Sequence, residues 1–450
     1  MWKLRFTTYS KSLLLILLLC SSQLSLADGL DELSQSASKN NPAESNQVLS
    51  LDAALSRVQL ANIGLAEIQA RAEAMAAIPS QEGSLPDPMI SFNALNLPTD
   101  SFDISQEAMT QMQFSISQQI PYPGKLALKE SAASHLAEAA DSSIGEMRLK
   151  LNQDVKTLWW NLFLIDRSVD VIEINKTLLR QFIEIAQTKY KVGQGLQQDV
   201  LLAQLELSKL IDHTIQLTSA RKQRSAQLNA LLNQASNTYI KLPVLADIDI
   251  SLPQLISEES VVNLAEQHRP ALSQQRSLIN VATDRQKLAE RDLLPDFNVG
   301  VAYGFRDGDN VNGSHRADLM SFKVGINLPL FAEHKQKMAI SQRHSEVKQQ
   351  QFALQDQWVN IQADITSAIA EYEQAKEQVL LFKTGILPQA NQTVASMLAG
   401  YQVNKVDFLN LIRAQITLYN YQTNEWKAIS DAKSALAKLV ANVGEDNIYE

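Results

Sequence analysis

Few side chains in this sequence have the type and spacing to bind a metal ion. Met109 and Met112 could place two thioethers on Cu(I) or Ag(I), which soft ligands suit, but two methionines at a strand edge are more typical of packing. The histidines form no HExxH or Cys-His pattern and are interpreted as surface residues: His135, His213, His268, His315, His334 and His344. We therefore predict no metal site and no cofactor.

Catalytic motifs are absent as well. The sequence has no G-x-S-x-G, no P-loop and no paired carboxylates in a glycine-rich frame. Its net charge of −9 argues against a nucleic-acid partner. We therefore expect a protein that is not an enzyme.

Residues 1–27 have the features of a secretory signal peptide. Basic residues precede a short apolar run, Leu13 to Leu19, and the segment ends at Ala27. That run is far shorter than the roughly 20 residues of a membrane-spanning helix. Cys20 follows a leucine where a lipoprotein signal needs a small residue, so lipidation is disfavoured and plain cleavage is expected. The mature chain then has no cysteine and no disulfide, and it begins with a loosely held segment at 28–49.

Long helices must position most of the mature chain. No proline occurs from Leu126 to Leu242, and glycine occurs there only at 145, 193 and 195. One helix filling the interval from Gly124 to Gly193 would be about 100 Å long, at 1.5 Å per residue. Apolar residues then recur at three- and four-residue steps, which is typical of a packed helical seam: Val200, Ala203, Leu207, Leu210 and Leu217. The glycine pair is therefore predicted to form the tip of a helical hairpin at about residues 190–199.

The same plan occurs twice. LPDPMISFN at 85–93 returns as LPDFNVGV at 294–301, FSISQQIP at 114–121 returns as FKVGINLP at 322–329, and residues 190–210 align without gaps with 401–421. Three matched segments in the same order, at offsets of 208 to 211, indicate a duplication. We assign the repeats to residues 50–239 and 261–445, with a linker at 240–260, a second tip at about 401–410 and a tail at 446–450.

Four segments alternate apolar and polar residues as strands do: 88–97, 111–121, 296–305 and 321–330. Each is long enough to cross a bilayer as a tilted strand, although a soluble sheet with one face on a core shows the same alternation. The very long helices and the export signal favour membrane strands. Four strands cannot close a barrel, which needs about eight, and open edges cannot lie in lipid. The strands would therefore be pooled in an oligomer, and the strand-to-helix turns are predicted at Pro121, Pro123, Gly124 and Pro329.

Together these segments resemble the outer-membrane efflux (TolC-type) protein family of Gram-negative bacteria. The resemblance is carried by the paired LPD strand entries, IPYPGK with its echo NLPLF, RPALSQQRSLI before the second strand pair, and the two tips. It covers nearly the whole mature chain. LPDPMISF and QQIPYPGK resemble most closely the branch that works with heavy-metal pumps of the resistance-nodulation-division (RND) type.

The resemblance implies a mainly helical fold with a small β part. Three chains would share one β-barrel in the lipid of the outer membrane, and their helical hairpins would form an α-barrel across the periplasm. The implied partners are a periplasmic membrane-fusion adaptor and an inner-membrane RND-type pump. The expected function is a passive duct of a tripartite efflux system, with heavy-metal cations as the first substrate class. The alternatives are the same duct in type I protein secretion or drug efflux, and a soluble periplasmic coiled-coil scaffold.

The family's tip motif carries over to this chain unevenly. In the first repeat it matches Tyr190, Val192, Gly193, Asp199 and Val200, with Leu196 between them, and in the second Val403 is kept. Asn404 replaces the glycine, while Asn410 and Arg413 replace acidic residues, so the resemblance does not imply a cation-binding ring at those two positions. Asp407 and Asp199 are the acidic groups left nearby. Asp199, Asp407 and Arg413 could form gate bonds or a charged ring, or simply be solvated groups at helix ends. The tip as a whole is expected to contact the adaptor or to gate the duct.

Overall fold

The computed structural model describes residues 48–449, so the predicted signal peptide and most of the predicted segment at 28–49 lie outside the described residues. The chain divides into two compact units. The described part of the smaller unit is residues 48–49 and 239–241, where the Leu49 N–H donates to the Lys241 carbonyl over 2.8 Å. The larger unit comprises Ser50–Thr238 and Leu242–Glu450.

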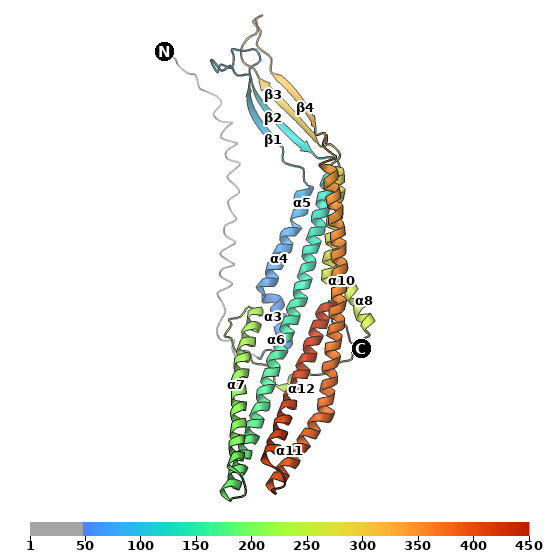
Figure 1. The fold of residues 1–450 in the computed structure, drawn as a ribbon. Helices are drawn as coiled ribbons and strands as arrows, with labels where there is room; N and C mark the ends of the chain where they lie inside the picture. The colour runs from blue at the N-terminus through green and yellow to red at the C-terminus, as the bar shows by residue number, and fades with distance from the viewer. Residues whose placement is uncertain (1–47, 450) are drawn as a thin grey trace, which may run out of the picture. The chain divides into compact units, whose positions relative to one another are not determined.

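The larger unit consists of long helices and one small sheet (Figure 1). In the first repeat the elements are α3 (Leu51–Ala61), α4 (Ile63–Ala76), α5 (Ile78–Gly83), β1 (Met89–Leu95), β2 (Gln111–Ile120), α6 (Lys125–Lys191) and α7 (Gln197–Leu231). In the second they are α8 (Glu258–His268), α9 (Pro270–Arg291), β3 (Phe297–Phe305), β4 (Leu319–Ile326), α10 (Gln336–Leu381), α11 (Leu387–Gln402) and α12 (Phe408–Val443). The predicted fold class, mainly helical with four strands, is confirmed.

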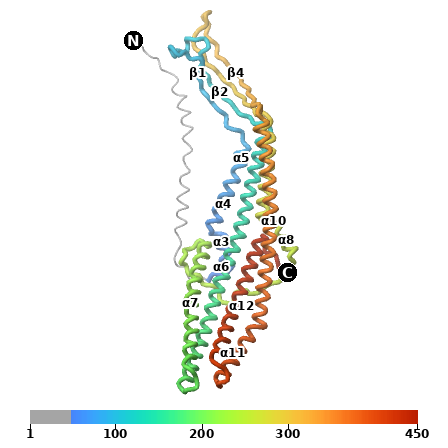
Figure 2. The backbone as a smooth tube through the Cα atoms, in the orientation of Figure 1, coloured from blue at the N-terminus to red at the C-terminus, as the bar shows by residue number. Residues whose placement is uncertain are grey.

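The 67-residue helix α6 organises the helical part. It packs against α9, α7 and α12, while α12 packs against α10 and α11. Large aromatic side chains fix this packing midway along α6: Trp159 stacks on Phe163 with ring centroids 6.2 Å apart, and Phe163 meets the edge of Trp426 from α12 at 5.8 Å. Both hairpin turns lie at the end of the long helices that is far from the sheet (Figure 2).

The second hairpin has a break that the first lacks. Between α10 and α11 the chain forms a single π-turn at Phe382–Ile386, which ends two residues before Pro388. Because proline has no N–H and its ring crowds the preceding turn, an extra residue in the turn relieves the conflict, as in other π-bulges.

The strands form one antiparallel sheet in the order β1-β2-β3-β4. β2 and β3 join the two repeats, with Ile116 opposite Val301 and Ile120 opposite Phe297. The fourth strand begins two residues before the predicted 321–330 segment and ends at Ile326. The Asn327 N–H still donates over 3.1 Å to the carbonyl of Asp296, its opposite residue in the same register, but the pairing cannot continue through Pro329, which has no N–H to donate.

Candidate functional site

The two hairpin turns have the same backbone geometry. Gly193 and Asn404 both lie in the left-handed region, with φ of 74° and 61°. In each turn the following residue closes the helix end, Gln194 donating to the Lys189 carbonyl at 2.8 Å and Lys405 to the Gly400 carbonyl at 2.9 Å. Asparagine is among the few side chains that tolerate this conformation. The change from glycine to Asn404 therefore preserves the turn.

Lys189, in the last turn of α6, joins the first hairpin to the second. Its buried ammonium donates to the Tyr401 carbonyl over 2.7 Å and to the side-chain oxygen of Asn404. It also lies 4.7 Å from the centre of the Tyr401 ring. The last carbonyls of a helix lack partners within the helix and carry its negative dipole end, so this cation satisfies the end of α11.

Tyr401 connects the turn to the acidic group at the start of α7. Its hydroxyl donates to Asp199 over a long 3.4 Å. Burial raises the pKa of Asp199 and the Asp407 charge adds to the rise, while the hydrogen bond from Tyr401 and the Lys189 charge oppose it. Burial, followed by the nearby Asp199 carboxylate, raises the pKa of Tyr401 to about 12. The phenol is therefore a neutral donor throughout the physiological range.

An apolar cluster beneath the turns holds the hairpins together. The rings of Tyr401 and Phe408 have centroids 5.0 Å apart. The buried members of the cluster are Ile172, Leu179, Phe182, Ala186, Ala203, Leu210, Tyr401, Phe408, Leu411 and Ile412. They come from α6, α7, α11 and α12, so moving one hairpin away from the other would expose this cluster.

The other predicted tip residues point to solvent. Asp407, Asn410 and Arg413 are exposed, and Arg413 has no ion pair with a described residue. Large exposed apolar side chains surround the turns: Tyr190, Val192, Leu196 and Val403. Within the described residues of one chain, no hydrogen bond or ion pair joins Asp199, Asp407 and Arg413 to one another, which matches the alternative interpretation of them as groups at helix ends. The residues that the sequence reasoning missed are Lys189, Tyr401 and Phe408.

The two aligned tyrosines of the repeat have different environments. Tyr190 is 49% exposed and Tyr401 is 5% exposed. The alignment of these tyrosines was the one sequence signal that pointed to Tyr401, but equivalence in a repeat does not determine which copy faces a neighbouring helix.

The strand-to-helix junctions lie at the other end of α6. Pro121, Pro123 and Gly124 connect β2 to α6, with Gly124 at φ 87°, and Pro329 lies between β4 and α10. The buried Lys125, first residue of α6, binds the carboxylates of Asp296 at 2.9 Å and Asp292 at 3.0 Å. IPYPGK and the second LPD motif are therefore brought into contact.

The sheet has one apolar face and one mostly polar or small-residue face. The register places these large exposed side chains on one face: Ile90, Phe92, Phe114, Ile116, Val299, Val301, Tyr303, Phe305, Met320, Phe322, Val324 and Ile326. The opposite face carries residues such as Ser91, Gln113, Ser117, Asn298 and Lys323. None of the helices covers the apolar face, so within the described chain it is open.

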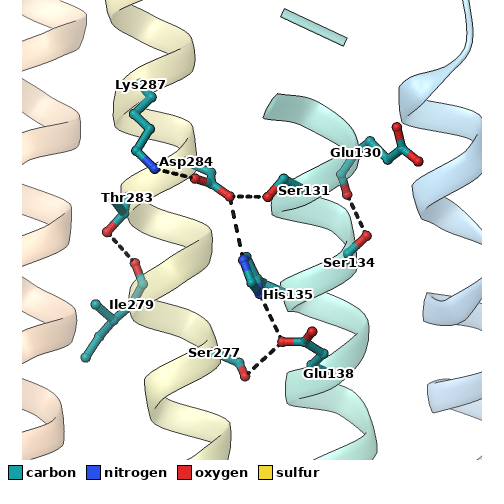
Figure 3. Close-up of polar contacts among 10 residues, drawn as sticks. All are labelled: Glu130, Ser131, Ser134, His135, Glu138, Ser277, Ile279, Thr283, Asp284 and Lys287. Atoms are coloured by element: carbon teal, nitrogen blue, oxygen red, sulfur yellow. Dashed lines mark hydrogen bonds and ion pairs between the residues drawn. The ribbon is translucent and has the colours of Figure 1, made fainter. Parts of the chain in front are cut away.

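A polar network joins α6 to α9 between these ends (Figure 3). The buried Asp284 accepts from Ser131 at 2.6 Å and pairs with Lys287 at 3.0 Å, and His135 lies 3.8 Å away. Although burial raises the pKa of Asp284, the Ser131 hydrogen bond and the Lys287 charge outweigh it and leave this pKa low. His135, predicted to be a surface residue, is half-buried between α6 and α9, with 28% of its side chain exposed. His213 is also part-buried, bonded to the Tyr419 hydroxyl at 2.6 Å. Within residues 48–449 no group of three or more His, Cys, Asp or Glu side chains is placed to hold a metal ion.

Within residues 48–449 no helix is long and apolar enough to cross a bilayer.

Known proteins resemble this chain in both sequence and fold. Residues 261–445 match the family model described as outer membrane efflux protein. The cobalt-zinc-cadmium resistance protein CzcC of Cupriavidus metallidurans is 20% identical over 385 residues, 84% of this chain and 86% of that protein.

Solved structures share the fold at low sequence identity. The outer-membrane channel OprN matches with a TM-score of 0.75 and 16% identity, over 88% of this chain and 89% of its own. CusC matches with a TM-score of 0.72 and 15% identity, over 88% and 92%. VceC of Vibrio cholerae also gives 0.72, at 16% identity, over 88% and 96%.

Proposed function

Since this chain, by the match of its residues 261–445, belongs to the outer membrane efflux protein family, a family of channels rather than enzymes, we propose that three copies form the outer-membrane duct of a tripartite efflux system. The single observation that carries the proposal is the open apolar face of the sheet. A soluble sheet would cover such a face with a core, whereas lipid covers it in a membrane.

The unpaired edges of β1 and β4 support an oligomer. Each sheet has four strands and exposes a row of backbone groups at both edges. Such edges are too costly to leave in lipid, so copies must pair edge to edge until the ring closes. Two copies would give a barrel of eight strands, whose interior side chains fill. Three copies give the smallest ring with room for a duct.

Heavy-metal cations are the proposed substrate class. The support is the similarity over most of both chains to a protein named for cobalt, zinc and cadmium resistance. A duct does not need to bind its cargo tightly, so substrate choice would lie mainly with a pump of the RND type, reached through a periplasmic adaptor. Drug efflux and type I protein secretion are the alternatives.

The tip is proposed as the adaptor contact and gate. The exposed apolar residues around both turns, Tyr190, Val192, Leu196 and Val403, offer a surface for another protein. The contacts of Lys189 with Tyr401 and Asn404 would hold the second hairpin in the closed position, and Asp199 would bind Tyr401 in the same state.

Two experiments test the proposal. Cell fractionation and gel migration with and without heating should place the protein in the outer membrane as a heat-dissociable trimer; recovery as a soluble periplasmic monomer would refute the duct. Deletion of the gene should lower tolerance to cobalt, zinc and cadmium more than to dyes and antibiotics. The reverse order would retain the duct but replace its substrate class.

A further inference from the structure

The contact between Lys125 and Asp296 joins the end of one strand to the start of its neighbour. Lys125 follows β2 and Asp296 precedes β3, and these two strands are paired. The Tyr122 N–H donates to the same carboxylate at 2.8 Å, and Arg291 donates to the Pro123 carbonyl at 2.7 Å. The contact therefore fixes where the β2–β3 pair stops and where α6 starts.

The internal repeat contains a second aspartate before a strand and a second lysine at the start of a long helix, and these two residues form no ion pair within the described chain. Asp87, in the first LPD motif, precedes β1 just as Asp296 precedes β3. Lys335 immediately precedes α10 after β4, much as Lys125 begins α6 after β2. Both side chains are exposed, and neither has an ion pair with a described residue. Asp87 precedes β1 and Lys335 follows β4, and these are the two edge strands of the sheet, so the two residues belong to opposite edges of one chain.

We propose that β4 of one copy pairs with β1 of the next in the register that places Val324 opposite Phe92, and that Lys335 binds Asp87 of that next copy. The inference rests on the proposed oligomeric duct and specifies its subunit boundary. The boundary between copies would thus repeat the boundary between the two halves of one chain.

The register follows from mapping the β2–β3 pair through the repeat. Phe114 corresponds to Phe322, so Ile116 maps onto Val324; Asp296 corresponds to Asp87, so Val301 maps onto Phe92. Since Ile116 lies opposite Val301, Val324 should lie opposite Phe92 of the next copy. By the same mapping Lys323 should lie opposite Asn93, because Ser115 lies opposite Ala302.

The face of each residue provides an independent check on this register. Val324 and Phe92 both lie on the apolar face, while Lys323 and Asn93 both lie on the other face. A slip of one residue would place the apolar side chains of one copy beside the polar side chains of the next. The alignment of the two repeats rests on residue identities and not on the face that each residue occupies. The register derived from it nevertheless keeps the apolar face continuous across the boundary between copies.

The lengths of the two repeats explain why Lys335 is the equivalent of Lys125. The offset between repeats is 208 at Phe114 and Phe322 and 211 at Tyr190 and Tyr401, so extra residues lie between strand and tip in the second repeat. Lys125 and Lys335 differ by 210. With Lys335 as the equivalent of Lys125, two of the three extra residues fall in the turn that follows Pro329. At the closer position, offset 208, the chain has Glu333, which already pairs with Lys337.

Disulfide cross-linking tests the register, because the mature chain is predicted to contain no cysteine. The double variants F92C/V324C and N93C/K323C, expressed in the outer membrane and oxidised, should give covalent dimers and trimers on a denaturing gel. Successive residue pairs in an antiparallel ladder alternate between hydrogen-bonded and non-hydrogen-bonded pairs, and the Cα atoms are closer in the non-hydrogen-bonded pairs, which are better suited to a disulfide. The two double variants together cover both kinds of pair. The controls are I90C/V324C and A94C/V324C, which keep the same face but shift the register by two residues.

The outcomes separate this inference from the proposed function. Stronger cross-linking in a shifted control, or none in any pair although heat-dissociable trimers form, would overturn the register and leave the duct intact. Loss of trimers in the parent protein itself would refute the duct. Only cross-linking that favours the mapped pairs supports the inference.

A charge exchange tests the ion pair. D87K and K335D should each lower the temperature at which the trimer dissociates, and the double variant D87K/K335D should recover most of the loss. The control is D87K/K337D, since Lys337 already pairs within its own chain. Exposed ion pairs contribute little individually, but the closed ring contains three copies of this contact. Equal recovery in the control, or no recovery in the exchange, would remove the Asp87–Lys335 contact from the boundary.

Discussion

Lys189 and Tyr401 lie 212 residues apart in the sequence, and the Lys189 ammonium donates to the Tyr401 carbonyl over 2.7 Å. The contact joins the last turn of α6 to the last turn of α11, so the two hairpins of one chain have a direct polar link at their tips. Because Lys189 is buried there, its loss would leave both the Tyr401 carbonyl and the Asn404 amide oxygen without this donor.

We therefore predict that Lys189→Ala opens the tip. Losing a buried charged hydrogen bond costs about 1–3 kcal/mol, which would raise the population of the open state about 5–150-fold. Single-channel conductance in a planar bilayer measures this change. Lys191→Ala is the matched control, since Lys191 is exposed two residues along the same helix. Equal conductance in the two variants would show that Lys189 does not hold the gate.

Asp199 should make the tip sensitive to pH. Burial raises the pKa of this carboxyl above its ordinary value of 3.8, so the closed tip retains a proton that a loosened tip would release. The stabilisation of the closed tip is thus complete below pH 3.8 and is lost as the pH rises through the raised pKa. Conductance should increase across that window in the parent channel. Asp199→Asn should abolish the step, while Asp212→Asn, on an exposed part of α7, should keep it.

Asn404 should discriminate between two small substitutions. At φ 61° the residue is in the left-handed region, which costs alanine about 1–2 kcal/mol and costs glycine nothing. Both substitutions remove the oxygen that Lys189 binds. Asn404→Ala should therefore make the turn more susceptible to limited proteolysis than Asn404→Gly does. A greater susceptibility of the glycine variant would mean that chain entropy outweighs strain in this turn.

The sequence predicted the elements far better than the contacts between them. Helix length, the hairpin seam and strand alternation are local periodicities, so the helix at residues 125–191 and the strand at 297–305 can be recognised from the order of their residues alone. Lys189 and Lys125, by contrast, each look like an ordinary exposed lysine, because their partners come from the other repeat. Their burial follows from how α6 packs against distant segments, and no spacing in the sequence contains that information.

The junction should lose stability when either partner of Lys125 and Asp296 is removed. Burial raises the pKa of Asp296, but the Tyr122 N–H and the Lys125 ammonium outweigh it, so the pKa lies below its ordinary value of 3.8. Its contribution is present above pH 3.8 and is lost as the pH falls through the lowered pKa. Lys125→Ala should cost about 2–3 kcal/mol near neutral pH and less in strong acid, as thermal unfolding would measure. Lys129→Ala should have a smaller effect than Lys125→Ala, because the Lys129 partner Glu82 is 4.0 Å away at the surface and the Lys129 charge is the weakest of the influences that lower the pKa of Asp296.

Residues on opposite faces of β4 should respond oppositely to a charge. Phe322 lies on the open apolar face and Ser321 on the other, although the two are adjacent in sequence. If lipid covers the apolar face, an arginine there costs about 2–4 kcal/mol near the middle of the membrane, whereas one facing the interior of the barrel is tolerated. Phe322→Arg should therefore reduce the amount of trimer recovered from the outer membrane, and Ser321→Arg should leave that amount near the parent level and change the conductance. If Ser321→Arg were the variant that fails to assemble, the polar face would be the one in contact with lipid, and the assignment of the two faces would have to be reversed.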